Sequence, residues 1–288
     1  MSLNPVEKAV LKTLKYRGIF NYPLTIREIY EYLITDELKK TVPKEEFQNA
    51  INSLITKNLV KRVNGYYCCG CDDFSDLIHR RKKREAVSRA RYREIKKMLD
   101  IFSKIDLIRF IGVSGAVAAG NADEKSDINL FVIAKTNSVW TARFWTSMYT
   151  KFKPKAKHVK FNIFVSSSNL EWGDKNIYTA HEILLLKPLF NKGAVYEKFI
   201  QKNLWVFDYF SNYPFEKVSM DFRVKKDRSK AEDESGLRTF SVNKILMKQQ
   251  LKSLEKGKIN GIFSNDLIHI KMPDHKKEVL KKWYKATF

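Results

Sequence analysis

Apolar residues recur at helical spacing in three successive segments before residue 58. The first segment begins at Asn4-Pro5 and ends at Gly18, and the third begins at Pro43; proline favours the first turn of a helix and glycine its end. Asn64-Gly65 then separates two β-prone runs, which is a strong short-range signal for a hairpin. Three helices followed by a hairpin predict a winged helix-turn-helix over residues 1–71.

Residues 72–105 predict one long helix, because neither proline nor glycine interrupts them. Ser75 is the expected N-cap. The apolar residues gather towards the end, as at Ile95 and Phe102, so we expect the last turns to pack on the core and the middle of the helix to lie in solvent. Between residues 80 and 97, ten Lys and Arg stand against two Glu.

The pattern changes after residue 105 to alternating strands and helices. Strands are predicted over 109–113, 127–134 and 158–166, and helices over 138–152, 176–190 and 194–210. Further on, a charged stretch at 225–235 predicts an exposed loop, and two helices are expected over 241–256 and 274–288. The predicted class is α+β, with domains at 1–71, 72–105 (the basic connecting helix), 106–210 and 211–288 (a C-terminal helical region).

Composition adds a charge imbalance to this picture. The 288-residue chain carries 54 Lys and Arg against 32 Asp and Glu, a formal net charge of +22. This imbalance favours a polyanionic partner, most simply DNA or RNA, although a general bias towards surface lysine gives the same number. The expected phosphate contacts come from the basic helix and the hairpin, at Arg80, Arg81, Lys82, Lys83, Arg84, Arg89, Arg91, Arg93, Lys61 and Arg62.

The third helix of the N-terminal domain gives a mixed signal. Glu45 and Glu46 at its start would repel phosphates, whereas Lys57, Lys61 and Arg62 on the hairpin side would attract them. The winged helix therefore suits either duplex DNA or a protein partner, and the sequence leaves both open.

The chain shows neither an apolar leader nor an apolar run long enough for a membrane span. We therefore expect a soluble, cytoplasmic protein. Cys68, Cys69 and Cys71 lie close together, but with His79 as a fourth ligand they match none of the usual zinc spacings. Reduced thiols at a strand end are expected instead.

The turn between the first two central strands is the main candidate for chemistry. Ser114-Gly115-Ala116 and Gly120 would bring backbone amides, which favour phosphate, next to Asp127 at the start of the following strand. The spacing of Gly115 and Gly120 matches a Walker loop, but Asn121 and Ala122 stand where that loop has Lys and Ser or Thr.

These residues resemble the nucleotidyltransferase superfamily that includes DNA polymerase beta. Its signature is Gly-Ser, about a dozen residues, and then Asp-apolar-Asp on a strand. Gly115-Ala116 stands at the Gly-Ser position, Gly120 matches a second glycine, and Ser126–Leu130 matches the strand. A bacterial and archaeal group of such proteins carries an N-terminal winged helix and a segment like Asn176–Glu182, so the resemblance covers roughly residues 100–205.

The resemblance implies a nucleoside triphosphate held by the amides of Ser114, Gly115, Ala116 and Gly120, and Mg²⁺ or Mn²⁺ held by Asp127. Three positions depart from the superfamily pattern: Ala116 replaces the serine, Asn129 replaces the second aspartate, and Asn162 stands where a third carboxylate is expected. Since a metal pair needs carboxylates, only weak metal binding is expected, with Asp127, Asn129 and Asn162 as the catalytic candidates.

Two functions therefore remain open. If the site is active, it transfers a nucleotidyl group to a hydroxyl in a Mg²⁺-dependent reaction. The alternative is a non-catalytic protein that binds nucleic acid or a protein partner. Glu182 is either a replacement carboxylate or, as we favour, a packing or capping pair with His181, and Arg143 reaches a phosphate or simply lies on the surface.

Overall fold

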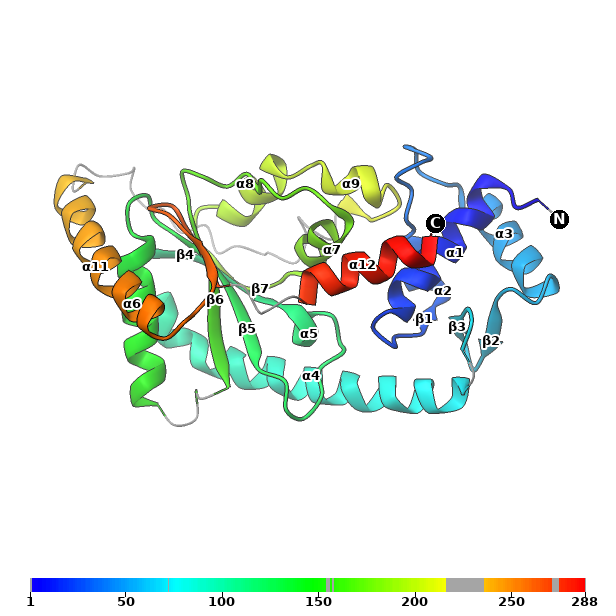
Figure 1. The fold of residues 1–288 in the computed structure, drawn as a ribbon, viewed down its shortest axis with the longest axis horizontal. Helices are drawn as coiled ribbons and strands as arrows, with labels where there is room; N and C mark the ends of the chain where they lie inside the picture. The colour runs from blue at the N-terminus through cyan, green and yellow to red at the C-terminus, as the bar shows by residue number, and fades with distance from the viewer. Residues whose placement is uncertain are drawn as a thin grey trace.

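The computed structural model describes residues 2–71, 73–153, 156, 158–215, 236–270 and 275–287. The loop expected at 225–235 lies outside these residues. Within them the protein is a mixed α+β molecule with one small and one large sheet (Figure 1).

The N-terminal part consists of three helices and a three-stranded sheet. The helices are α1 (Pro5–Gly18), α2 (Ile26–Glu31) and α3 (Lys44–Thr56), and the strand order is β1 (Leu24–Thr25), β3 (Tyr66–Cys68), β2 (Lys61–Val63). Asn4 caps α1 in a capping box with Glu7. Asn64 and Gly65 both have positive φ, at 50° and 78°, so the predicted tight hairpin is confirmed.

Helix α4 (Phe74–Ser103) connects the two parts and runs along the molecule from the small sheet to the large one (Figure 1). Its N-cap is Asp73, whose carboxylate accepts the Asp76 N–H at 2.9 Å, so the expected cap at Ser75 is wrong. The middle of α4 does not lie free in solvent either: the buried Ser88 hydroxyl accepts the Ala122 N–H at 3.0 Å. Residues seven apart face inward along the whole helix, at Arg81, Ser88, Ile95 and Phe102.

The large sheet has six strands in the order β7-β4-β5-β6-β9-β8. Strands β5 and β6 are parallel, and the other neighbours are antiparallel. The strands are β4 (Ile108–Ser114), β5 (Ile128–Ala134), β6 (Val159–Ser166), β7 (Lys187–Asn191), β8 (Gly261–Phe263) and β9 (Leu267–Ile270).

Both faces of the large sheet are covered, which explains why β5 is apolar at every position except Asn129. Phe131 and Ile133 pack into one core with α7 (Ile177–Leu185), α8 (Val195–Lys202) and α9 (Val206–Tyr209). Leu130 and Val132 pack into the other core with α4, α6 (Val139–Phe152) and α11 (Gly236–Lys256). Helix α12 (His275–Thr287) returns to the N-terminal part and lies beside α1 (Figure 1). There the Trp283 ring contacts the Tyr16 ring.

Three sequence predictions fail in the second half of the chain. The helix expected over 176–190 ends at Leu185, and β7 follows it, with Pro188 on an outer strand of the sheet, where a missing N–H is tolerated. The helix expected over 194–210 is broken at Asn203 into α8 and α9. Strands β8 and β9 were not anticipated, so residues beyond 211 form more than a helical region.

Candidate functional site

The turn that follows β4 has the form that its glycines suggested. Gly115 begins the four-residue helix α5 (Gly115–Ala118) with φ +65°, and Gly120 has φ +70°. A Cβ placed on Gly115 would lie 3.1 Å from Asn129 Nδ2, so both the backbone angle and the close approach require glycine there. Ser114 is paired with Asn129 across the sheet. The turn and the start of β5 are therefore in contact, as expected.

Asp127 lies just before β5 and is partly exposed. Its Oδ1 lies 3.7 Å from His158 Nδ1, with 34% of the Asp127 side chain and 37% of the His158 side chain exposed. His158 immediately precedes β6, the parallel neighbour of β5. Asp127 is thus partly in solvent and pairs with a histidine that lies just before the adjacent strand.

Asn129 and Asn162 are hydrogen-bonded to each other: Asn162 Nδ2 donates to Asn129 Oδ1 at 2.8 Å. The contact depends on an irregularity in the ladder, where Leu130 pairs with Phe161 but Phe131 pairs with Ile163. Asn162 is the extra residue. Phe161 therefore packs with the α6 side of the sheet and Ile163 with the α7 side, although regular alternation along a strand would place both on one face.

Glu182, on α7, is bound to one of the four backbone amides that were expected to bind phosphate. Its carboxylate accepts the Gly115 N–H; burial raises the pKa of Glu182 to about 7, although this hydrogen bond and the charge of Arg17 act in the opposite direction. The neighbouring His181 is buried, with Nε2 3.1 Å from Arg17 Nη1 on α1. Glu182 therefore caps the turn, and His181 joins α7 to the N-terminal part.

These contacts decide whether the residues could hold the two magnesium ions of an active nucleotidyltransferase. Mg²⁺ prefers hard oxygen ligands in near-octahedral geometry, together with substrate phosphates. Here the Asn129 amide oxygen accepts from Asn162, and the Gly115 amide is bound by a carboxylate. Asp127 alone keeps oxygens that are partly open to solvent, beside His158. The arrangement does not fit the two-metal site of an active nucleotidyltransferase.

The basic residues of α4 divide into three groups. Three of them face inward: Arg81 is buried, Arg84 donates to Asn121 Oδ1 at 3.1 Å, and Arg91 donates to the Glu124 carbonyl at 3.2 Å. Three exposed ones have acidic partners, namely Arg80 with Asp76, Lys83 with Glu124 and Arg89 with Glu85. Lys82, Arg93, Lys96 and Lys97 are exposed and have no ion-pair partner among the side chains that the structure describes, which do not include that of Asp100.

Arg81 is therefore the clearest error among the expected phosphate contacts. Its guanidinium lies between Glu28 and Glu85 at 2.9 and 2.8 Å, donates to the Pro23 carbonyl, and stacks over the rings of Tyr22 and Tyr66. Glu85 at the i+4 position and the seven-residue spacing of inward positions are the sequence signals that could have revealed this role.

The hairpin side of the N-terminal part keeps two of its three expected cations exposed. Lys61 and Arg62 lie in solvent, whereas Lys57 Nζ is 2.6 Å from the buried Glu7 carboxylate and so fastens α3 to α1. The outer face of α3 exposes Glu45, Glu46, Gln48, Asn49 and Asn52. The cysteine prediction is also wrong in part, since Cys68 forms a disulfide with Cys71 and Cys69 is free.

Comparison with known proteins does not assign the chain to a family. No protein-family model matches the chain, and a search of curated proteins finds no match. Among the described residues, no helix has the length and apolar character needed to cross a membrane.

Proposed function

We propose that this protein binds nucleic acid along α4 and does not transfer nucleotides at the Asp127 site. The observation that carries the proposal is a row of exposed basic side chains on one face of α4, here called the basic row: Lys82, Arg89, Arg93, Lys96 and Lys97. Lys82, Arg89, Arg93 and Lys96 follow one another at intervals of seven, four and three residues, and Lys97 lies four residues after Arg93. Positions at these intervals share one side of a helix.

The dimensions of the basic row suit a phosphate backbone. From residue 82 to residue 97 an α-helix rises about 22 Å, which spans several phosphates of one strand. Four of the five cations are unpaired among the described residues, so an incoming polyanion would not have to displace acidic partners. Binding of this kind is driven by counterion release and is not sequence-specific by itself.

At the level of fold, we infer a winged helix joined to a nucleotidyltransferase-like domain. Three helices with a tight hairpin support the first part, and the glycine turn between two central strands supports the second. The internal use of the Gly115 amide by Glu182, and of the Asn129 oxygen by Asn162, supports a binding role over catalysis.

The test compares two variants that remove the same charge. In the first, Arg93, Lys96 and Lys97 are changed to Gln; in the second, the exposed Lys40, Lys198 and Lys202 are changed to Gln. Affinity for a duplex and for a single strand is measured over a range of salt concentrations. For the duplex, each lost phosphate contact should reduce the slope of log K against log salt by about 0.9. Equal slopes for the two variants would reject the proposal that the basic row binds nucleic acid.

A second measurement addresses catalysis. The protein is incubated with labelled nucleoside triphosphates, RNA or DNA, and Mg²⁺ or Mn²⁺, and we expect no incorporation. Incorporation that is lost in Asp127→Ala would show that the site is active and that the non-catalytic part of the proposal is wrong.

A further inference from the structure

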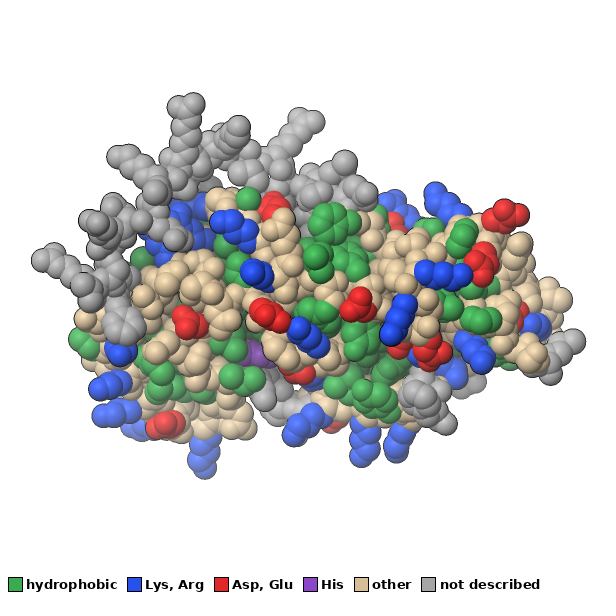
Figure 2. All heavy atoms as spheres, turned by 90° about the horizontal axis from the view of Figure 1, so that it is seen from above, with side chains coloured by type: hydrophobic (Ala, Val, Ile, Leu, Met, Phe, Trp, Pro, Cys, Tyr) green, Lys and Arg blue, Asp and Glu red, His purple; other side chains and the backbone are tan. Residues whose placement is uncertain are grey.

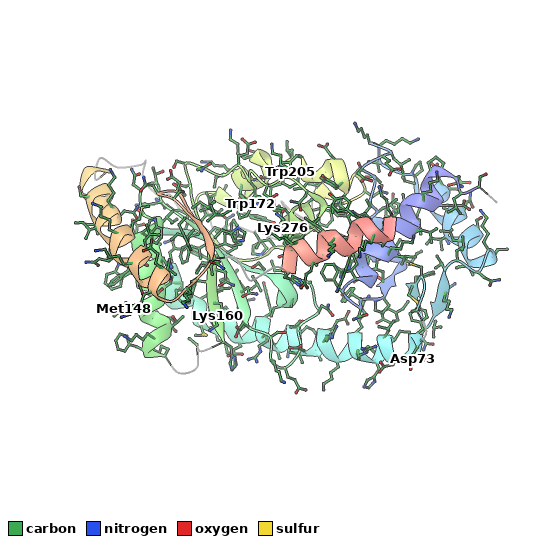
Figure 3. All side chains as sticks on the ribbon, in the orientation of Figure 1. Asp73, Met148, Lys160, Trp172, Trp205 and Lys276 are labelled. Atoms are coloured by element: carbon green, nitrogen blue, oxygen red, sulfur yellow. A yellow bond between two sulfur atoms is a disulfide. The ribbon has the colours of Figure 1, made fainter. Side chains whose placement is uncertain are left out.

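An open cleft of about 320 Å³ lies between α6 and β6, on the face of the large sheet opposite to α7. Its polar lining consists of Arg143, Ser147, Thr150, Lys151, Lys160 and Asn162. The four residues from α6 share one side of that helix by their spacing. Figure 3 shows Lys160 at the end of β6 and Met148 on the neighbouring α6.

The charge of the cleft has one sign. Three cations line it, and none of its lining residues is acidic. Figure 2 shows that Lys and Arg are also more frequent than Asp and Glu on the end of the molecule that α6 and α11 occupy, in the face drawn there. Such a concentration of positive charge favours an anionic ligand.

Arg143 gives the most specific indication. Its guanidinium is half-buried and donates to the neutral Gln250 Oε1 at 2.5 Å, and no carboxylate pairs with it among the described residues. Burial lowers the pKa of Arg143. A partly desolvated cation without a counter-charge is unfavourable, so an anion in the cleft would stabilise it. The planar guanidinium matches the oxygens of a phosphate in geometry.

The rest of the lining narrows the class of ligand. The Ser147 hydroxyl can donate to a phosphate oxygen, whereas the Thr150 hydroxyl donates to the Ser147 carbonyl at 3.0 Å. Phe161 and Ile270 supply an apolar surface. The volume lies at the lower end of small-molecule sites. We propose that the cleft binds a phosphate monoester that carries an aromatic or apolar group, with a nucleoside monophosphate as the matching size class. This site is independent of the basic row of α4.

The experiment is a calorimetric titration of the full chain with adenosine 5′-monophosphate, adenosine and inorganic phosphate. We expect the monophosphate to bind and adenosine to bind much more weakly. Lys151→Ala and Lys160→Ala should each weaken monophosphate binding by about tenfold or more, since each removes a charge-assisted contact. Lys153→Ala is the matched control, because Lys153 is exposed, carries the same charge and lies outside the cleft lining.

Two results would overturn the proposal: no binding of either phosphate-containing probe to the wild-type protein, or equal losses in Lys151→Ala and Lys153→Ala. Competition then identifies the source of the phosphate. A 5′-phosphorylated oligonucleotide that displaces the monophosphate, when its 5′-hydroxyl counterpart does not, assigns the cleft to a nucleic-acid end. If neither oligonucleotide displaces the monophosphate, the cleft is assigned to a free nucleotide.

Discussion

Arg81 and Arg80 are adjacent on α4, and the structure gives them opposite roles. Arg81 is 4% exposed and lies between Glu28 of α2 and Glu85 of α4. Arg80 is 46% exposed and, within the described part of the chain, pairs only with Asp76 on its own helix. We predict that Arg81→Met destabilises the fold and leaves nucleic-acid binding intact, whereas Arg80→Met has little effect on stability.

The expected magnitude follows from what Arg81→Met leaves behind. Burial alone would raise the pKa of Glu28, and the hydrogen bond and charge of Arg81 bring it below its ordinary value. Removing one partner of a buried ion pair costs about 3–5 kcal/mol. Because Glu28 and Glu85 remain 24% and 25% exposed, we expect the lower end of that range, about 3 kcal/mol. For Arg80→Met we expect less than about 1 kcal/mol, as for a surface pair.

Urea unfolding and thermal unfolding, both followed by circular dichroism, measure the difference in stability, and filter binding to a labelled duplex is the second readout. The thermal midpoint of Arg81→Met should fall by about 6–12 °C, at about 2–4 °C per kcal/mol for a protein of this size range. Equal stability of the two variants would refute the reasoning. So would an Arg81→Met protein of wild-type stability that no longer binds the duplex.

Two further predictions concern buried polar groups. Glu182 has a pKa of about 7 in the folded state against an ordinary 4.5, so the native state holds the proton more tightly than the unfolded state does. The free energy of unfolding of the wild-type protein should therefore fall as the pH rises from about 4.5 to 7. Glu182→Gln should not show this fall when unfolding is measured across the same pH range. Asn203 is fully buried, and its side chain makes four hydrogen bonds, including those to the Leu170 and Phe199 carbonyls. Asn203→Ala should therefore cost about 2–4 kcal/mol in urea unfolding, while the exposed Asn49→Ala changes little.

The elements that the sequence predicted well are those whose local signals agree with their packing. Helix α1 has both its cap at Asn4 and its end at Gly18, and the Asn64-Gly65 hairpin has the backbone angles that these two residues favour. Helix α7 was predicted too long because Leu185 and Leu186 continue an apolar run that serves first a helix and then a strand. What ends the helix is pairing of β7 with β4, a contact between distant residues that no local pattern contains.

The candidate site was predicted in its backbone and not in its side-chain contacts. The glycines at 115 and 120 and the neighbouring Asn129 lie as expected, because turn chemistry is local. The Glu182 contact with Gly115 joins residues 67 positions apart, and the Asn129–Asn162 bond depends on a ladder irregularity. Both require the tertiary structure, which is why the sequence left the role of Glu182 open.

The division of charges on α4 limits the number of phosphate contacts that the protein can make, which its net charge alone does not. Of the ten Lys and Arg between residues 80 and 97, three face inward and three have acidic partners, which leaves four free within the described part of the chain. Lys61 and Arg62 on the hairpin raise the number of contacts that can form without breaking an ion pair to six at most, since Arg89 of the basic row is paired with Glu85. The slope of log K against log salt for a duplex should therefore lie between about −3.5 and −5.5, whereas ten contacts would give about −9. A measured slope near −9 would show that the inward and paired arginines are released on binding, and that the fold around Arg81 opens when nucleic acid binds.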